Sequence, residues 1–261
     1  MIPKIIHYCW FGRGAKSELM LKCIESWRHY CPDYQIIEWN EDNYDTGSTP
    51  LFVQQALKKK VWAFATDYIR YDVVYRHGGI YLDTDVELVG SLDPLLNNIA
   101  YFGFQQKDRY SVNSGLGFGA QKGEIFLLEL MNIYKTSDFI TNGTINLHTN
   151  SSREKKVFLR HGLIENGRTQ VLDNQVRIYA KEYLAPYNHM TDVIEQTDKT
   201  ISIHWYGESW SGSVEKVRQS KNTIQIIKNS VHLPAKLCKY LMSEEKYSRI
   251  RVRVLNFLSR L

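Results

Sequence analysis

Apolar residues near the start of the chain follow first a strand-like and then a helix-like pattern. Residues 4–10 and 34–39 are short runs rich in isoleucine and aromatic residues, whereas the stretch 16–31 places apolar residues at every third or fourth position. Pro32 ends that stretch. The order predicts a strand, a helix and a second strand, which form a β-α-β unit. The expected buried stripe of the helix consists of Leu19, Cys23, Trp27 and Tyr30.

Two further helices are expected before the middle of the chain. Thr49 and Pro50 are typical of a helix cap followed by the first helical residue, so we expect a helix that ends at Lys60. The stretch 62–77 has apolar residues at helical spacing and stops at Gly78 and the glycine after it, as helices do where the backbone needs a positive φ. A short hydrophobic run follows at once.

Shorter patterns complete the expected fold. We expect strands at 101–104 and 116–119 and a helix at 124–134. Strands that alternate with helices predict an α/β protein with a mixed, mainly parallel sheet flanked by helices. Sheets of this kind bind ligands beyond the carboxyl ends of their strands. Polar residues that come just after the predicted strands are therefore the first candidates for a functional site.

The segment 78–87 carries the strongest chemical signal. A strand here would place Asp83 and Asp85 on one face, together with Tyr81 and Glu87, because side chains alternate along an extended chain. Adjacent carboxylates repel unless a cation or a proton lies between them, and Mg²⁺ and Mn²⁺ bind such oxygen ligands together with substrate phosphates. The pattern predicts a site for a divalent ion and a diphosphate. A solvated strand end is the alternative, since so short a motif also occurs by chance.

Several stretches together resemble a known enzyme family. Residues 62–70, WAFATDYIR, and 78–85, GGIYLDTD, closely resemble the sugar-binding region of glycosyltransferase family 32, and 2–12 and 32–41 are similar to it as well. The family includes bacterial capsule and lipopolysaccharide transferases and yeast α-mannosyltransferases, and the catalytic domains of clostridial glucosylating toxins are related to it. The resemblance implies a single nucleotide-sugar-binding domain of the GT-A type.

The resemblance also implies roles for three residues outside the Asp-x-Asp pair. It places Asp67 and Arg70 on the hydroxyls of the donor sugar and near the diphosphate, and their spacing lets both lie on one helix face. Trp10 matches a tryptophan that stacks on the donor's uracil in the related toxins. The alternatives are a surface ion pair for Asp67 and Arg70 and a buried core position for Trp10.

A second candidate segment lies late in the chain. Residues 201–211 lead from a short alternating strand into His204 and then into a cluster of aromatic residues. As a third ligand beside Asp83 and Asp85, His204 suits Mn²⁺, which accepts imidazole together with carboxylates. A structural histidine is the alternative.

The resemblance adds donor-binding candidates just after this histidine. In the toxins a Glu, a Ser and a Trp of a late loop contact the metal and the diphosphate, which points to Ser209 and Trp210 here. The spacing in this chain differs from theirs. It leaves open whether His204, Glu208 or Ser209 completes the metal site.

Composition indicates a compact enzyme. A chain of 261 residues with 43% hydrophobic residues can bury one large core. The net charge of +5 is modest, and no long basic run precedes the C-terminal segment, so we expect no nucleic-acid partner. Without a signal-peptide pattern or an apolar run of about eighteen residues, a cytoplasmic protein is expected. The cysteines lack the spacing of a zinc site and read as reduced thiols: Cys9, Cys23, Cys31 and Cys238.

The end of the chain, residues 247–261, combines an apolar helical stripe with several arginines. We expect residues 1–230 to form the catalytic domain and 231–261 a C-terminal helical segment. That segment either docks on the domain or lies on an anionic membrane surface. A peripheral contact with the inner face of the plasma membrane would place the enzyme beside a lipid-linked acceptor.

Together these features predict a metal-dependent glycosyltransferase. It would use Mn²⁺ or Mg²⁺ and move a hexosyl group from a nucleotide-sugar donor, with a UDP-sugar favoured, to a glycan acceptor in bacterial surface polysaccharide synthesis. The resemblance implies retention at the anomeric carbon. A haloacid-dehalogenase-like phosphatase, which also uses Asp-x-Asp, and a non-catalytic glycan-binding protein of the same fold are the alternatives. Asn113-Ser114-Gly115 is a candidate for positioning the sugar or the acceptor, and the candidate acceptor-side segments are 141–154 and Asp173-Asn174.

Overall fold

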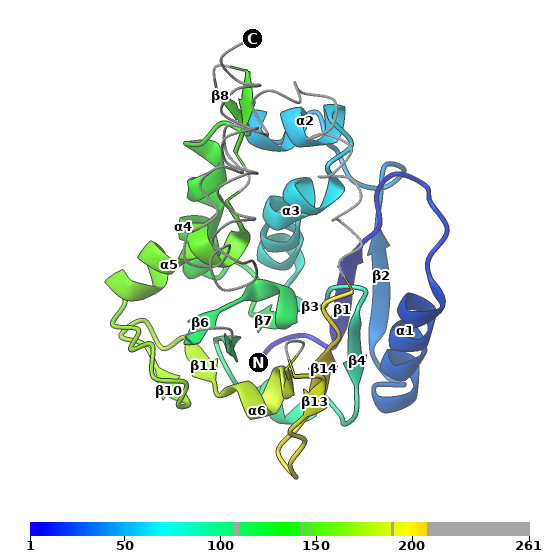
Figure 1. The fold of residues 1–261 in the computed structure, drawn as a ribbon, viewed down its shortest axis with the longest axis vertical. Helices are drawn as coiled ribbons and strands as arrows, with labels where there is room; N and C mark the ends of the chain where they lie inside the picture. Colours follow the sequence, from blue (N-terminus) through cyan, green and yellow to red (C-terminus); the bar gives the residue numbers. More distant parts are fainter. Residues whose placement is uncertain (107–109, 142, 147, 189–190, 208–261) are drawn as a thin grey trace, which may run out of the picture. The chain divides into compact units, whose positions relative to one another are not determined.

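The computed structural model describes residues 1–106, 110–141, 143–146, 148–188 and 191–207 (Figure 1). They belong to the first of two units, Met1–Trp210, and the second unit is Ser211–Leu261. Several predictions therefore lie outside the described residues. These are the domain boundary at residue 230, the C-terminal helical segment, and the roles of Glu208, Ser209 and Trp210.

A mixed sheet carries the fold. Its strand order is β10-β11-β5-β7-β3-β1-β2, with β6 paired to β5. Five strands, β2, β1, β3, β5 and β11, run in one direction, while β7 and β10 run against their neighbours. The predicted mixed, mainly parallel sheet is confirmed. Its strands are β1 (Ile5–Cys9), β2 (Gln35–Trp39), β3 (Gly79–Tyr81), β5 (Ala100–Gln106), β6 (Tyr110–Val112), β7 (Phe118–Ala120), β10 (Gln170–Val171) and β11 (Arg177–Tyr179).

Helices flank this sheet, as predicted. Helix α3 packs against β1, β3 and β7 and against α2 and α4, whereas α1 packs against β4. Figure 1 shows α1 and α3 on opposite sides of β1. The helices of the described residues are α1 (Glu18–Tyr30), α2 (Leu51–Lys58), α3 (Trp62–His77), α4 (Ile125–Lys135), α5 (Asn150–Arg160) and α6 (Lys181–Leu184).

Helix α1 confirms the predicted helix but not all of its predicted stripe. Tyr30 is exposed and Leu19 is only partly buried. The indole N–H of Trp27 donates a hydrogen bond to the Val86 carbonyl (2.7 Å), which fixes the face that α1 turns toward β4. The buried residues on that face are Met20, Cys23, Ile24 and Trp27.

The predicted start of α2 is displaced by one residue. Pro50 is the N-cap, and no side chain caps the helix. The hydroxyl of Thr49 instead donates to the Thr46 carbonyl (2.7 Å) in the turn before the helix, and it does not cap the helix. The helix ends at Lys58, two residues earlier than predicted.

The turn from α3 into β3 is confirmed, and His7 of β1 holds it. Gly78 ends α3 with a φ of 70°, and Gly79 follows with a φ of 112°. The His7 Nε2 donates to the Gly78 carbonyl (2.8 Å), and its Nδ1 accepts from the Trp39 indole N–H (3.1 Å). A Cβ added at Gly79 would lie 2.7 Å from the Ile5 carbonyl oxygen, so glycine is needed for β3 to approach β1.

The predicted continuous strand through the acidic pair is wrong. β3 ends before Asp83, and a turn follows in which the Val86 N–H donates to the Asp83 carbonyl (3.0 Å). After this turn β4 (Val86–Leu88) leaves the main sheet and pairs with β14 (Ser202–His204). The chain needs the turn because its next partner is the late strand rather than a neighbour in the main sheet.

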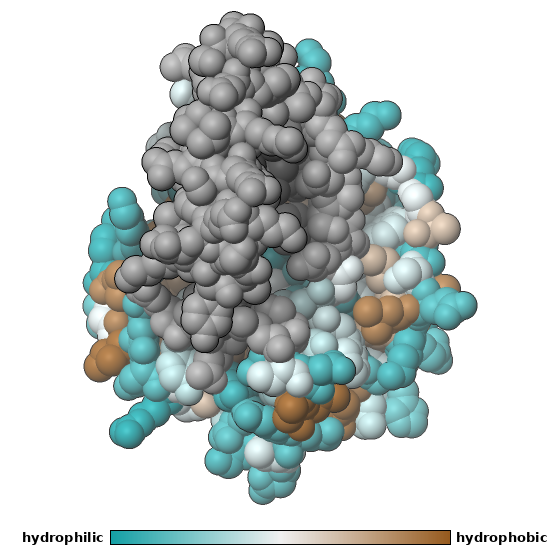
Figure 2. Space-filling view, viewed as in Figure 1, coloured by the Kyte–Doolittle hydropathy of each residue, from teal (hydrophilic) through white to brown (hydrophobic). Residues whose placement is uncertain are grey.

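The remaining short elements lie outside the main sheet. They are the 3₁₀ turns Asp93–Leu95 and Ser114–Leu116 and the hairpins β8 (Ile140–Thr141) with β9 (Thr144–Ile145) and β12 (Tyr187–Asn188) with β13 (Val193–Ile194). Within the described ranges, no helix is long and apolar enough to cross a membrane. On the face shown in Figure 2, hydrophobic residues of the described part form small separate patches among hydrophilic ones. Cys9, Cys23 and Cys31 are buried free thiols.

Candidate functional site

The three predicted metal ligands come together in space. Asp83 and Asp85 lie at the turn between β3 and β4, and His204 is the last residue of β14, opposite Val86 of β4. The side-chain ligand atoms of the three residues all lie within 4.8 Å of one another. His204 is buried, whereas both aspartates are partly exposed. The cluster forms because β4 pairs with β14, and not because the two aspartates share one face of a strand.

Asp85 is held by the segment around His204. Its Oδ2 accepts a hydrogen bond from the Gly207 N–H (2.7 Å), and its Oδ1 lies 3.4 Å from the Nε2 of His204. Its main-chain carbonyl accepts from the Trp205 N–H (3.0 Å). The indole N–H of Trp205 donates in turn to Oε2 of Glu87 (2.8 Å). Two segments far apart in sequence are thus fixed to one another by side-chain and main-chain hydrogen bonds.

The donor set of this cluster fits a hard divalent cation. Mg²⁺ and Mn²⁺ take carboxylate oxygens, and Mn²⁺ also accepts imidazole. Burial raises the pKa of Asp83, and the charge of Asp85 adds to the rise while Arg70 opposes it. Two carboxylates therefore lie close together at an electrostatic cost that a bound cation would offset.

The imidazole of His204 needs a particular proton arrangement to bind that cation. The Tyr206 N–H donates to Nδ1 of His204 (3.3 Å), which leaves Nε2 directed at Asp85. A neutral imidazole whose Nδ1 accepts a hydrogen bond carries its proton on Nε2. An ion at Nε2 therefore requires the other tautomer, in which Nδ1 carries the proton and no longer accepts from Tyr206, whereas the two carboxylates need no such change.

Arg70 joins the acidic cluster to helix α3. Its Nη2 lies 3.2 Å from Oδ1 of Asp67 and 3.4 Å from Oδ1 of Asp83, and its guanidinium carbon lies 5.1 Å from the centre of the Tyr81 ring. The side chains of Arg70 and Asp67 are only 5% and 11% exposed. They do not form a surface ion pair. Removing one partner of such a buried pair leaves the other charge uncompensated, which is strongly destabilising.

Burial gives Asp67 and Arg70 different protonation behaviour. It raises the pKa of Asp67 to about 7, although the charge of Arg70 acts in the opposite direction. Burial also works against the charge on Arg70, but Asp83 and other neighbours raise its pKa well above the ordinary value. The guanidinium therefore stays charged. A carboxyl group that gains a proton near neutral pH can both accept and donate hydrogen bonds, which suits sugar hydroxyls.

A loop between β6 and β7 completes the surroundings of Arg70. Ser114 accepts a hydrogen bond from Nη1 of Arg70 (3.4 Å) and donates one to Glu154 (3.1 Å). A Cβ added at Gly115 would lie 2.7 Å from Oδ2 of Asp83. The segment predicted to position the sugar or the acceptor, Asn113-Ser114-Gly115, thus lies against Arg70 and Asp83. Sequence analysis included Glu154 only as the end of the acceptor-side stretch 141–154 and gave it no role of its own, because nothing in the charged residues around it marks it as buried.

Trp10 lies at the end of β1. Because β1 and β3 run in parallel, it follows its strand at the same sheet edge as the acidic turn. The ring is partly buried, its indole N–H donates to the Gly14 carbonyl (2.8 Å), and the ammonium of Lys16 lies 5.1 Å from the ring centre. Trp10 packs at the margin of the core and is not fully enclosed by it.

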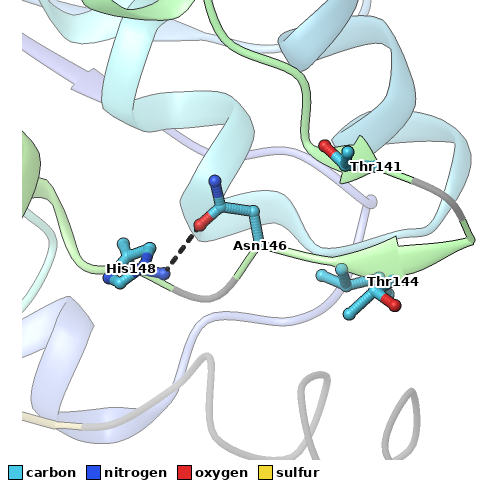
Figure 3. A pocket seen from close by; sticks show the side chains of 5 residues that line it. Thr141, Thr144, Asn146 and His148 are labelled. Atoms are coloured by element: carbon cyan, nitrogen blue, oxygen red, sulfur yellow. Dashed lines mark hydrogen bonds between the residues drawn. The ribbon is translucent and has the colours of Figure 1, made fainter.

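A cavity of about 500 Å³ lies beside the hairpin β8–β9 (Figure 3). The side chain of Asn146 accepts a hydrogen bond from the His148 N–H (3.2 Å), drawn as a dashed line in Figure 3. No residue of the acidic cluster lines the cavity, which belongs to the stretch 141–154 predicted for the acceptor side. Its lining residues are Thr141, Thr144, Ile145, Asn146 and His148.

The sequence around this site matches a known family. Residues 17–101 match the family described as the glycosyltransferase sugar-binding region containing a DXD motif. The matched residues include Asp67, Arg70 and the Asp-x-Asp pair, whereas Trp10 and His204 lie outside them. The predicted resemblance is confirmed over this part of the chain.

Two curated yeast proteins are similar to a larger part of the chain than this sugar-binding region. Inositol phosphoceramide mannosyltransferase 3 of Schizosaccharomyces pombe is 32% identical over 133 residues, which are 50% of this chain and 36% of that protein. Mannosyl phosphorylinositol ceramide synthase CSH1 of Saccharomyces cerevisiae is 32% identical over 107 residues, which are 39% of this chain and 27% of that protein. The chain spans about a third of the length of these relatives.

Solved glycosyltransferase structures are more distantly similar. The PaToxG glycosyltransferase has a TM-score of 0.47 and 16% identity and covers 61% of this chain and 69% of its own. The galactosyltransferase LgtC has a TM-score of 0.38 and 12% identity and covers 82% of this chain and 95% of its own. The assignment of the sugar-binding region therefore rests on the sequence match and on the geometry of the site.

Proposed function

We propose that the chain is a metal-dependent glycosyltransferase that moves a hexosyl group from a nucleotide-diphosphate sugar to a hydroxyl group. One observation carries the proposal. Arg70 contacts both Asp67 and Asp83, so the sugar-binding pair and the cation-binding cluster are in direct contact. The sugar and the diphosphate of one donor are covalently joined, and a site that recognises both must place the two groups of residues side by side. The family match over residues 17–101 supports the same conclusion.

Each residue of the site has a role in this reaction. Asp83, Asp85 and His204 would hold Mn²⁺ or Mg²⁺, which neutralises the charge that develops on the departing diphosphate. Asp67 binds sugar hydroxyls, and the fixed fork of Arg70 orients the sugar beside the diphosphate. The departing phosphate takes the proton of the incoming hydroxyl, and the new bond keeps the configuration of the anomeric carbon.

Two donors are expected, a UDP-sugar and a mannosyl donor. Trp10 offers a partly buried aromatic plane at the sheet edge where the acidic turn lies. The first expectation is that a uracil base stacks on this ring, and the donor is then a UDP-sugar. The names of both yeast relatives refer instead to a mannosyl group. We therefore propose a hexose donor and test the two expectations with UDP-glucose, UDP-galactose and GDP-mannose.

The acceptor is proposed to be a hydroxyl of a lipid-linked glycan or glycolipid. Both relatives are named for ceramide-containing lipids, which favours such an acceptor over the bacterial surface polysaccharide expected from the sequence. The hydroxyl, amide and imidazole groups around the cavity at residues 141–148 suit a polar acceptor. A lipid acceptor is also compatible with a cytoplasmic protein that touches a membrane through the basic, apolar sequence at 247–261.

A thermal-shift screen tests the proposed function. The protein is heated with each of the three nucleotide sugars, with and without Mn²⁺ and with EDTA as the control. A ligand that binds the folded state raises the melting temperature by mass action, so we expect a shift from a nucleotide sugar that disappears with EDTA. Hydrolysis of a phosphate monoester without a nucleotide-sugar shift would instead favour the phosphatase alternative. Metal-dependent binding without any turnover would favour a glycan-binding protein.

A further inference from the structure

Glu154 of helix α5 is a fully buried carboxylate outside the acidic cluster. Its Oε1 accepts a hydrogen bond from the Ser114 hydroxyl (3.1 Å). Its Oε2 and the buried Tyr71 hydroxyl make no hydrogen bond of ordinary geometry within the described part of the chain, although the two side chains lie close enough for Tyr71 to lower the pKa of Glu154. Glutamate is rarely fully buried unless it is paired, because removing its charge from water costs free energy. Burial raises the pKa of Glu154, as expected for such a position. The contacts of such a group inside the fold therefore call for an explanation.

Ser114 connects Glu154 to Arg70. The single hydroxyl proton of Ser114 points to Glu154, so its lone pairs are free to accept hydrogen bonds. They accept from Nη1 of Arg70 (3.4 Å) and from Nδ2 of Asn150 (3.1 Å), the first residue of α5. The carboxylate of Glu154 therefore fixes the direction of the hydroxyl and makes it an acceptor for the guanidinium.

The other donors of Arg70 are directed elsewhere. Its Nε donates to the Thr66 carbonyl (3.3 Å), and its Nη2 faces Asp67 and Asp83. Ser114 is therefore the partner that holds the Nη1 edge. If the Ser114 hydroxyl turns its proton toward Arg70, that edge faces a donor instead of an acceptor, and the guanidinium loses one of the contacts that fix its orientation over Tyr81.

We propose that Glu154 is a positioning residue that, through Ser114, orients Arg70 toward the sugar of the donor. This inference deepens the proposed function and rests on it. The same helix also holds the acceptor-side stretch, because Arg153 donates to the carbonyls of His148 (2.9 Å) and Asn146 (3.3 Å). Helix α5 thus connects the cavity in Figure 3 with the residues that hold the donor sugar.

Three variants and one control separate positioning from general stability. Glu154→Gln keeps an acceptor oxygen for Ser114, Glu154→Leu removes it, and Ser114→Ala removes the connecting hydroxyl. Val157→Ala is the matched control, because Val157 is buried on the same helix and belongs to none of these hydrogen bonds. Two dissociation constants are measured in Mn²⁺, one for the nucleoside diphosphate and one for the nucleotide sugar that stabilises the wild type. The quantity compared is the first constant divided by the second, so weaker binding of the sugar lowers the ratio.

We expect Glu154→Leu and Ser114→Ala each to reduce this ratio by about tenfold, since a hydrogen bond to a charged group is lost from the sugar-binding residue. Glu154→Gln should stay within about twofold of the wild type, because an amide oxygen also accepts a hydrogen bond. Val157→Ala should lower the melting temperature and leave the ratio unchanged. The double variant of Glu154→Leu and Ser114→Ala should lose little more than either single variant, since both act through one connection.

The outcomes that differ from these expectations refute either the positioning role of Glu154 or the proposed function itself. A normal ratio in folded Glu154→Leu refutes the positioning role and leaves the proposed function standing. An equal loss in Val157→Ala shows that α5 acts through stability alone. If Glu154→Leu does not fold, Ser114→Ala tests the same connection by itself, and a normal ratio there refutes it. A wild type that binds the nucleotide sugar no better than the nucleoside diphosphate refutes the proposed function and this inference together.

Discussion

Acid should destabilise the fold through His7, the residue that holds the turn before the acidic pair. Its side chain is fully buried, and each ring nitrogen has one partner: Nε2 donates to Gly78, and Nδ1 accepts from the Trp39 indole. A proton added at Nδ1 would face the N–H of Trp39, donor against donor. The folded protein therefore keeps His7 neutral, and protonation is coupled to unfolding.

The size of the effect follows from the change in pKa. Burial lowers the pKa of His7 to about 4, with the Gly78 hydrogen bond partly opposing the shift. In the unfolded chain the pKa is about 6.5, so the unfolded state binds the proton more tightly and the free energy of unfolding falls as the pH drops from about 6.5 to about 4. The full effect is about 3 kcal/mol, and between about pH 7.5 and about pH 5 it is about 2 kcal/mol.

Urea unfolding of the wild type, His7→Gln and His29→Gln at these two pH values measures the effect. The free energy of unfolding of the wild type should fall by about 2 kcal/mol more than that of His7→Gln, which cannot titrate at this position. His29→Gln should follow the wild type, because His29 is exposed on α1 and stays in water in both states. An equal fall in the wild type and His7→Gln would refute a neutral, buried histidine at this turn.

Two further predictions concern the donor site. Arg70→Ala should destabilise the fold, because Asp67 loses its buried partner. In the protein that circular dichroism shows to be folded, it should weaken binding of the nucleotide sugar far more than binding of the bare nucleoside diphosphate in calorimetric titrations, because the lost hydrogen bonds belong to the hexose; equal losses would indicate a structural ion pair. Gly115→Ala should lower the affinity for Mn²⁺ by about tenfold, because its Cβ would lie 2.7 Å from Oδ2 of Asp83 and displace a ligand. Gly90→Ala is its control, because the nearest atom to a Cβ there lies at 3.7 Å, and an equal loss in both would contradict this reasoning.

Local patterns were enough to predict the elements that carry the site. The β1-α1-β2 unit, helix α3 and its glycine stop depend on periodicity and backbone conformation, which short stretches of sequence express directly. The position of the helix stripe in α1 was less predictable, because the hydrogen bond from Trp27 to Val86 spans 59 residues. Local sequence therefore predicted which elements form better than it predicted how each one faces its neighbours.

The acidic pair shows the same limit at the site itself. The two aspartates do lie together, but they do so at a turn and not through the alternation of a strand. Their meeting with His204 depends on the pairing of β4 with β14, whose residues are more than a hundred positions apart. Ligand chemistry could suggest His204 as a third ligand, whereas periodicity could not place it beside Asp85. Glu154 had no signal of either kind, since only its burial beside Ser114 reveals it.

The most direct test of the central claim is the rate of Mn²⁺-dependent donor turnover in Asp85→Asn. Asp85 pairs with His204 and accepts from Gly207, and an asparagine keeps one of its oxygens while removing the charge that would bind the cation. Turnover should fall by at least about a hundredfold with an unchanged circular dichroism spectrum, whereas Asp42→Asn, at an exposed aspartate, should match the wild type. Turnover of Asp85→Asn within a few-fold of the wild type would contradict a metal-dependent glycosyltransferase built on this cluster.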